Sequence, residues 1–152
     1  SYDIEGRLNF FIARAVYENP LKYIYPKAVK SEIIFNELFI DFESPIVLTE
    51  GVFDAIRIEN AIPLLGSTLS TKTKLFRKLV EYKPEVYIAL DGDAKGKALQ
   101  ILKLLQRWDI KTSFIDVNPW HDLAEIPVGE LEEVFQNSIT GDFKNQISLA
   151  LK

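Results

Sequence analysis

The sequence predicts an α/β protein whose mainly parallel sheet is covered by helices on both faces. From residue 46 onward, short apolar runs of strand length alternate with longer segments of helical periodicity, as in a parallel sheet with crossover helices. Acidic clusters follow two of these runs directly, at the sheet edge where open α/β folds place their binding crevices. With 152 residues and 47% hydrophobic content, the chain is long enough for one well-packed core and a small additional lobe.

The predicted sheet region begins after Ser44-Pro45, which marks a turn. Its clearest helix is 94–108, because apolar residues recur there at three- and four-residue spacing (Ala98, Ile101, Leu102, Leu105 and Trp108). The full predicted order is strand 46–49, helix 52–60, strand 62–65, helix 71–82, strand 85–90, helix 94–108 and strand 112–117. Segments 128–138 and 142–151 predict one or two further helices, broken near Thr140-Gly141.

The first 44 residues predict a smaller α+β lobe. Residues 6–16 are rich in Leu, Phe and Ile, which predicts strand material that ends at Asn19-Pro20. Residues 22–26 form a second short extended piece, which Pro26 limits. The segment 31–42 fits either class, because the spacing of its apolar residues fits a helix whereas its β-branched and aromatic content fits a strand.

Composition excludes several classes of protein. No stretch approaches the roughly 20 apolar residues of a membrane helix, and the amino terminus lacks a secretory pattern, so we expect a cytoplasmic protein with no membrane partner. The formal net charge of −4 argues against a generally basic nucleic-acid-binding surface. Zero cysteines and a single histidine, His121, exclude disulfides and thiolate or histidine-rich zinc sites. Any bound metal is therefore expected to be an oxygen-liganded ion such as Mg²⁺ or Mn²⁺.

The strongest chemical signal comes from carboxylates that follow two of the predicted strands. Glu50 and Asp54 come directly after the first strand of the sheet region, and Asp91 and Asp93 come directly after the third. Mg²⁺ is held by carboxylates from separate chain segments, with positions left for water and substrate phosphate. The pattern therefore predicts a divalent-metal site at this edge of the sheet.

Single carboxylates in this set also have structural explanations. Asp54 is placed where a first-turn acid is favoured by the helix dipole, and Asp93 is placed to cap the following helix. Gly92 lets the backbone bend between the two aspartates and approach a phosphate closely. A third acidic position, Asp122, follows the strand predicted to end at Val117. The metal-site prediction depends on the whole set rather than on one member.

These motifs resemble the Toprim domain of bacterial-type DNA primases and phage primase-helicases. The resemblance is carried by Glu50-Gly51-x-x-Asp54, Leu65-Gly66-Ser67 with Ser70, Asp91-Gly92-Asp93 with Gly96 and Ala98, and Asp122. Upstream residues are similar to the amino-terminal lobe of the primase RNA polymerase core, in the same order: Asp3, Gly6-Arg7, Ala13-Arg14, Lys22-Tyr23 and Lys30. The resemblance spans roughly residues 3 to 126. It implies part of the primase lobe at 1–44, a Rossmann-like Toprim domain at 45–126 and a helical extension at 127–152.

The resemblance also implies roles for individual residues. Glu50, Asp91 and Asp93 would be catalytic. Glu50 would lie next to the reacting oxygen as a metal ligand or a general acid-base, and Asp91 and Asp93 would hold Mg²⁺ or Mn²⁺. Asp54 and Asp122 would complete the metal-binding set. The residues that face template or incoming nucleotide would be Arg14, Lys22, Tyr23 and Lys30. Tyr23 would either stack on a base or fill the space between the lobes.

The implied function is that of a DNA primase core, which makes short RNA primers on single-stranded DNA by metal-dependent nucleotidyl transfer. The expected partners are a single-stranded DNA template, nucleoside triphosphates and a replicative helicase in cis or in trans. Two other functions stay open: a Toprim-type nuclease or topoisomerase-like module that cleaves DNA, and a non-catalytic adaptor that binds nucleotide or nucleic acid. Aspartate at position 54 and the Gly-Arg and Lys-Tyr pairs upstream favour the primase. We expect the chain to be part of a longer polypeptide, because it has no methionine and because the zinc-binding module of such primases needs cysteines.

Overall fold

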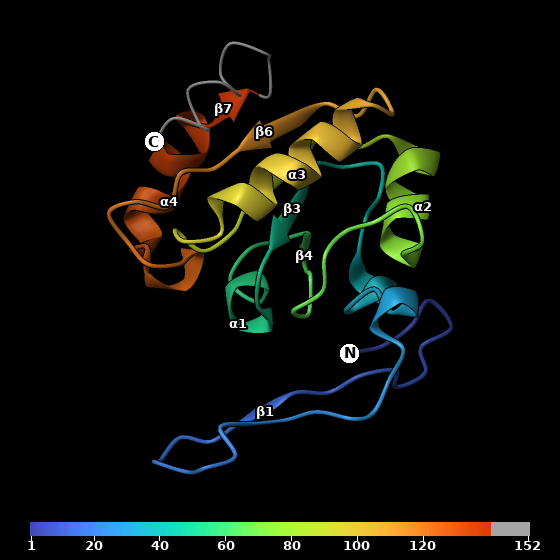
Figure 1. The fold of residues 1–152 in the computed structure, drawn as a ribbon, viewed down its shortest axis with the longest axis vertical. Helices are drawn as coiled ribbons and strands as arrows, with labels where there is room; N and C mark the ends of the chain where they lie inside the picture. The colour runs from blue at the N-terminus through green and yellow to red at the C-terminus, as the bar shows by residue number, and fades with distance from the viewer. Residues whose placement is uncertain (141–152) are drawn as a thin grey trace.

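The computed structural model describes residues 1–140, in which a five-stranded sheet forms the centre of the molecule (Figure 1). Its strands are Ile46–Thr49 (β3), Ala61–Pro63 (β4), Val86–Ala89 (β5), Thr112–Phe114 (β6) and Ile139–Thr140 (β7). They lie in the order β4-β3-β5-β6-β7. β4, β3, β5 and β6 are parallel, and β7 pairs antiparallel with β6 at one edge. The predicted α/β fold with a mainly parallel sheet is confirmed.

Helices cover both faces of this sheet. They are Val52–Ala55 (α1), Lys74–Tyr82 (α2), Lys95–Gln106 (α3), the 3-10 helix Leu123–Glu125 (η3) and Val128–Gln136 (α4). Successive side chains of a strand point to opposite faces. Ile46 and Leu48 therefore pack with α2 and α3, whereas Val47, between them, packs with α1, η3 and α4. The sheet is thus buried on both sides, which fixes the ends of its strands in space. No helix within the described residues is long and apolar enough to cross a bilayer.

The predicted elements of the sheet region are all present, but one helix is much shorter than predicted. The helix predicted at 52–60 ends at Ala55. Asn60 adopts a left-handed backbone with φ of 57°, and its side-chain amide exchanges hydrogen bonds of 2.8 and 2.9 Å with the backbone of Asp41. These bonds hold the chain in a turn. The prediction of a helix beyond Ala55 is therefore wrong. The helix predicted at 142–151 lies outside the described residues.

The amino-terminal lobe contains less regular structure than the sequence predicts. The strand predicted at 6–16 is reduced to Ala13–Arg14 (β1), which pairs antiparallel with Tyr23–Ile24 (β2). Gly6, with φ of 76°, lies instead in a tight loop. A hydrogen bond of 2.8 Å from the Arg7 backbone N–H to Oδ1 of Asp3 closes this loop. The ambiguous segment 31–42 forms neither a strand nor an α-helix. It contains two short 3-10 helices, Lys30–Glu32 (η1) and Glu37–Phe39 (η2).

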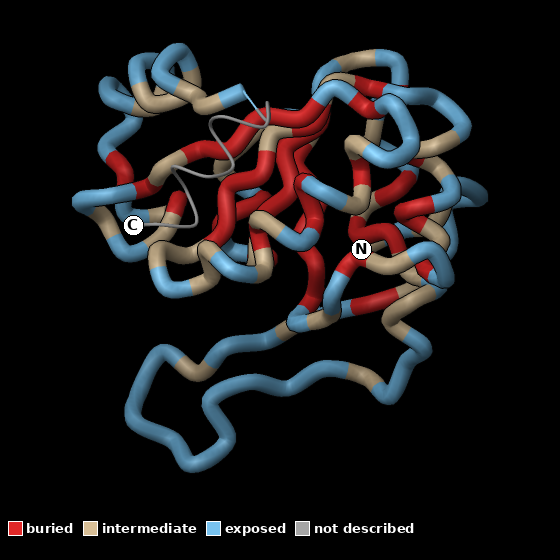
Figure 2. The backbone as a smooth tube through the Cα atoms, turned by 45° about the horizontal axis from the view of Figure 1, so that its top comes forward, coloured by how far each residue is buried: buried red, intermediate tan, exposed pale blue. Residues whose placement is uncertain are grey.

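The chain around β1 and β2 projects away from the body of the molecule as a long hairpin, here called the hairpin arm and comprising residues 11–29 (Figures 1 and 2). No residue of the arm is buried. Its tip is apolar as well as exposed, with Val16 96%, Tyr17 71% and Leu21 68% exposed. Apolar side chains of the arm are thus left facing solvent.

Packing at the base of the arm joins the lobe to the sheet region. Phe10 and Phe35 of the lobe meet edge to face, with ring centroids 6.5 Å apart, in a cluster that includes Val52. Lys74 of α2 forms an ion pair of 2.6 Å with Glu37, whose side chain is only 2% exposed. These contacts fix the base of the arm against the sheet region.

Candidate active site

Acidic side chains converge where the neighbouring parallel strands β3 and β5 end. Glu50 follows β3 and Asp91 follows β5. The pKa of Asp91 is raised to about 6, first by burial and then by the negative charges of Glu50, Asp54, Asp122 and Asp93. Like charges raise one another's pKa only when they lie close together in a poorly solvated place. The other four carboxylates that the sequence singled out therefore lie near enough to Asp91 for their charges to act on it.

Within residues 1–140, the Glu50 carboxylate has one ion-pair partner, a lysine. Lys97, in the first turn of α3, places its Nζ 3.0 Å from Oε1 of Glu50. Oε2 of the same carboxylate is buried and has no hydrogen-bond partner among the described residues. A buried oxygen without a partner is costly, so this atom calls for an explanation. Lys97 was not among the residues predicted from the sequence, where 47 positions separate it from Glu50.

Asp54 is buried in the first turn of α1 and connects three parts of the site. Its Oδ2 accepts a hydrogen bond of 3.2 Å from the Gly51 backbone N–H, and its Oδ1 accepts one of 3.2 Å from Ala124. Burial, followed by the charge of Asp122, raises the pKa of Asp54. Both carboxylate oxygens thus accept hydrogen bonds from the protein backbone. Asp54 therefore connects the loop after β3 with η3.

The Asp91-Gly92-Asp93 turn lies directly against the third acidic segment. The Gly92 backbone N–H donates a hydrogen bond of 3.0 Å to the carbonyl oxygen of His121. A Cβ built at Gly92 would lie 3.7 Å from the same oxygen, so the two backbones are in close contact. Asp122 caps η3, because its Oδ1 accepts a hydrogen bond of 3.0 Å from the Glu125 backbone N–H. Asp93 is the exposed member of the turn.

Arg57 fixes the segment that carries Asp122. Its guanidinium donates hydrogen bonds to the carbonyl oxygens of Leu123, Ala124 and Ile126. Since Arg57 follows α1, this contact holds the third acidic segment beside the loop after β3. No sequence motif marks Arg57, so it too was not among the predicted site residues.

The donor set fits Mg²⁺ or Mn²⁺. Within residues 1–140, no three His, Cys, Asp or Glu side chains form a preformed metal cage. Mg²⁺ does not require one, because it keeps several water ligands and binds through one or two carboxylates plus substrate phosphates. The unpaired Oε2 of Glu50 and the crowded Asp91 are the two places where a cation would relieve an electrostatic cost. Glu50 and Asp91 are therefore the best candidates for ligands.

Residues 45–114 match the family model described as the Toprim domain. The chain contains a Toprim domain. The matched residues include the first four predicted carboxylates and exclude Asp122, which follows the match. No curated protein sequence matches the chain.

A similar solved structure extends the likeness beyond the Toprim domain. It is the crystal structure of the Aquifex aeolicus primase, comprising zinc-binding and RNA polymerase domains. The TM-score is 0.73 at 24% sequence identity, and the match covers 91% of this chain and 39% of the Aquifex chain. This chain therefore spans about two fifths of that chain's length. The likeness shows that the lobe and the Toprim domain together have the fold of part of a primase.

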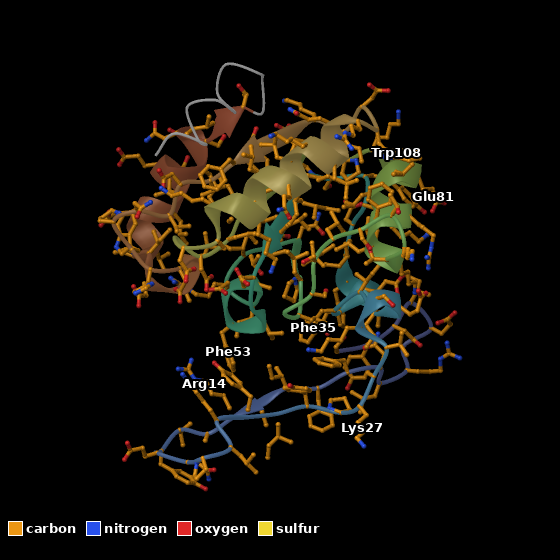
Figure 3. The ribbon with its side chains drawn as sticks, viewed as in Figure 1. Arg14, Lys27, Phe35, Phe53, Glu81 and Trp108 are labelled. Atoms are coloured by element: carbon orange, nitrogen blue, oxygen red, sulfur yellow. The ribbon has the colours of Figure 1, made fainter. Side chains whose placement is uncertain are left out.

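The hairpin arm faces the Toprim domain at Phe53 of α1 (Figure 3). The guanidinium carbon of Arg14 lies 5.7 Å from the ring centroids of both Phe53 and Tyr23. Both distances are within the range of a cation–π contact. Lys22, on the arm, lies 5.8 Å from the ring of Tyr23. Arg14 thus connects the arm with α1, whereas the ring contact of Lys22 stays within the arm.

Lys30 contacts the Toprim domain at the base of the arm. Its Nζ donates a hydrogen bond of 2.9 Å to the carbonyl oxygen of Leu65 and lies 4.7 Å from the ring centroid of Tyr25. Leu65 belongs to the turn after β4 that was part of the sequence resemblance. Lys30 is half-buried, which distinguishes it from the exposed Arg14 and Lys22.

A cleft of about 230 Å³ separates the arm from the Toprim domain and reaches Glu50. Most of its walls are aromatic or aliphatic, and Lys30 supplies one positive charge. The lining residues are Phe10, Ile12, Tyr23, Tyr25, Lys30, Glu50, Gly51, Val52, Phe53, Leu65 and Gly66. Tyr23 and Lys30 were predicted as binding residues, whereas Phe10, Tyr25 and Phe53 were not. The cleft thus brings predicted residues from both lobes to one place.

Proposed function

We propose that the chain is the catalytic core of a DNA primase, which joins ribonucleotides into short RNA primers on a single-stranded DNA template. The observation that supports this most strongly is the cleft that reaches Glu50 between the carboxylates of the Toprim domain and the aromatic and basic arm. The Toprim match and the fold likeness to the Aquifex primase support the same function. Nucleoside triphosphates would be the substrates.

In this proposal, Glu50 and Asp91 hold the divalent ion, with Asp93 on the solvent side of the same turn. When bound, Mg²⁺ or Mn²⁺ supplies charge neutralisation at the triphosphate and lowers the barrier to attack by a 3′-hydroxyl. The reaction forms a bond from the 3′-oxygen to the α-phosphorus, breaks the bond from that phosphorus to the oxygen of the departing pyrophosphate, and releases the proton of the 3′-hydroxyl to solvent. Asp54 and Asp122 keep the loops that carry these groups in position.

The arm would supply the nucleic-acid contacts. Arg14 and Lys22 are exposed cations that suit backbone phosphates, and Tyr23 presents a ring on which a base can stack. Lys30 lies in the cleft and suits a nucleotide phosphate. Because priming accompanies strand separation, a replicative helicase in cis or in trans would be the partner, and the cytoplasm would be the compartment.

The test is incubation of the protein with single-stranded DNA, nucleoside triphosphates and Mg²⁺ or Mn²⁺, followed by a search for short RNA. Both this chain and the longest protein that its gene encodes should be assayed. We expect RNA products that disappear in Asp91→Ala. Full activity in that variant would remove the catalytic role of Asp91. Nicking of supercoiled plasmid would favour a nuclease, and nucleotide binding without turnover in the longest protein would favour an adaptor.

A further inference from the structure

Lys97 occupies a position that is unfavourable for its own helix. It lies in the first turn of α3, which contains no acidic residue and has no side-chain hydrogen bond at its N-cap, Ala94. The amino end of a helix carries a partial positive charge, so an acidic residue stabilises it there and a basic residue does the opposite. The helix itself therefore does not explain this lysine.

The contact with Glu50 does explain it. The two side chains are 20% and 30% exposed, so their ion pair of 3.0 Å is partly shielded from water. The lysine satisfies Oε1 and leaves the buried Oε2 without a partner. The Lys97 ammonium therefore neutralises the Glu50 carboxylate, and Oε2 of that carboxylate remains free to bind another cation.

Among the residues that the structure describes, Lys97 is also the only direct counter-charge of the acidic cluster. Within residues 1–140, no other Lys or Arg forms an ion pair with any of its five carboxylates, Glu50, Asp54, Asp91, Asp93 and Asp122. Several negative charges in a small volume repel one another unless a cation is present. Lys97 therefore supplies the positive charge that the site needs before a divalent ion arrives.

We propose that Lys97 is the resident counter-cation of the acidic site: it neutralises Glu50 until a divalent ion binds, and then contacts the phosphates of the incoming nucleotide. The second step rests on the proposed primase function. A lysine suits both steps, because its flexible four-carbon stem and three donors allow the ammonium to exchange one oxygen partner for another without movement of α3. Oε1 of Glu50, freed in this way, becomes available to the ion.

The proposal predicts opposite effects on two ligands. For a divalent ion alone, Lys97 is a competitor, so loss of its charge should tighten binding. For a nucleoside triphosphate with its ion, Lys97 is a contact, so the same change should weaken binding. A residue with a purely structural role would not shift the two affinities in opposite directions.

The test compares Lys97→Met with Lys103→Met. Methionine keeps most of the apolar stem and removes the charge, and Lys103 is an exposed lysine on the same helix. Calorimetry should measure binding of Mn²⁺ alone and then of a nucleoside triphosphate in the presence of Mg²⁺. In Lys97→Met, we expect the Kd for Mn²⁺ to fall about threefold to tenfold and the Kd for the nucleotide to rise by a similar factor. Lys103→Met should change either Kd by less than about twofold.

Lys97→Arg should retain the wild-type affinity for Mn²⁺, because it keeps the charge. An unchanged or weaker affinity for Mn²⁺ in Lys97→Met would overturn the counter-cation role. Unchanged nucleotide binding in that variant would overturn the transfer to phosphate. Binding of Mn²⁺ alone requires no primer synthesis, so this result is independent of whether the chain makes RNA.

Discussion

The Toprim sheet and the hairpin arm place their apolar residues in opposite environments. Ile46, Leu48 and Ile88 of the sheet are completely buried, whereas Val16 and Leu21 of the arm are largely exposed. Figure 2 shows the same contrast along the backbone, with a mostly buried sheet and an exposed arm. Burial on both faces gives the sheet its stability and holds the strand ends, with their carboxylates, in fixed positions. The arm contributes little packing and presents its side chains to solvent. The molecule thus combines a rigid scaffold for chemistry with an exposed surface suited to a ligand.

The largest effect of this difference should be on stability. Ile88→Ala removes a fully buried side chain of β5 and should lower the free energy of unfolding by about 2–5 kcal/mol. Ile24→Ala makes the same kind of change in β2, where the side chain is 54% exposed, and should stay within about 0.5 kcal/mol. Urea unfolding of both variants measures the contrast. Equal losses would mean that the arm packs against the body more tightly than the structure shows.

The same contrast separates what the sequence could predict from what it could not. β3 with Glu50 and β5 with Asp91 are predictable, because a buried strand is an apolar run and its end is marked by the first charged residue. The second half of helix 52–60 is not, since bonds between Asn60 and Asp41 override the local pattern. Because no residue of the arm is buried, its sequence carries no hydrophobic periodicity from which its strands could be predicted.

The candidate site residues also divide into those that the sequence could predict and those that it could not. The carboxylates are visible in the sequence because they form short motifs at strand ends. Lys97 and Arg57 are not, because their partners lie 47 and 66 or more positions away and a single lysine or arginine carries no pattern. Phe53 becomes significant only when the arm brings Arg14 to its ring. Long-range contacts such as these require the three-dimensional structure.

A smaller effect should appear in the pH dependence of stability without divalent ions. The pKa of Asp91 is raised from 3.8 to about 6 in the folded protein, chiefly by burial, so the folded state holds this proton more tightly than the unfolded chain. Asp91 therefore lowers stability as the pH rises from about 4 through about 6, and stays destabilising above that range. Asp91→Asn should melt a few degrees higher than wild type at pH 7.5, and the gain should shrink toward pH 4.

Asp109→Asn is the matched control, because Asp109 is exposed and has a left-handed backbone that asparagine tolerates. Its melting temperature should follow wild type at every pH. A gain in Asp91→Asn that does not vary with pH would contradict the crowding of charge around Asp91.

The smallest effect on stability is expected in the arm, where binding should change instead. Arg14→Ala removes two exposed cation–π contacts and should lower the free energy of unfolding by at most about 1 kcal/mol. It should nevertheless weaken binding of single-stranded DNA and reduce the slope of log affinity against log salt by about one. Fluorescence anisotropy over a salt series measures both. Arg107→Ala, an exposed arginine at the end of α3, should leave binding unchanged. Wild-type DNA affinity in Arg14→Ala would show that the arm does not bind the template.

The most direct test of the acidic centre is the rate of nucleotide addition to a primer on a DNA template with Mn²⁺, measured for Asp91→Asn beside Asp109→Asn. Both changes remove one carboxylate charge and keep its shape, but only Asp91 lies at the end of β5 beside Glu50. Asp91→Asn should lose at least about 100-fold in rate, because the proposed function makes Asp91 a ligand of the metal at the reacting phosphate. Asp109→Asn should stay within about twofold of wild type. An Asp91→Asn variant that adds nucleotides at the wild-type rate would contradict the assignment of these carboxylates as the catalytic centre.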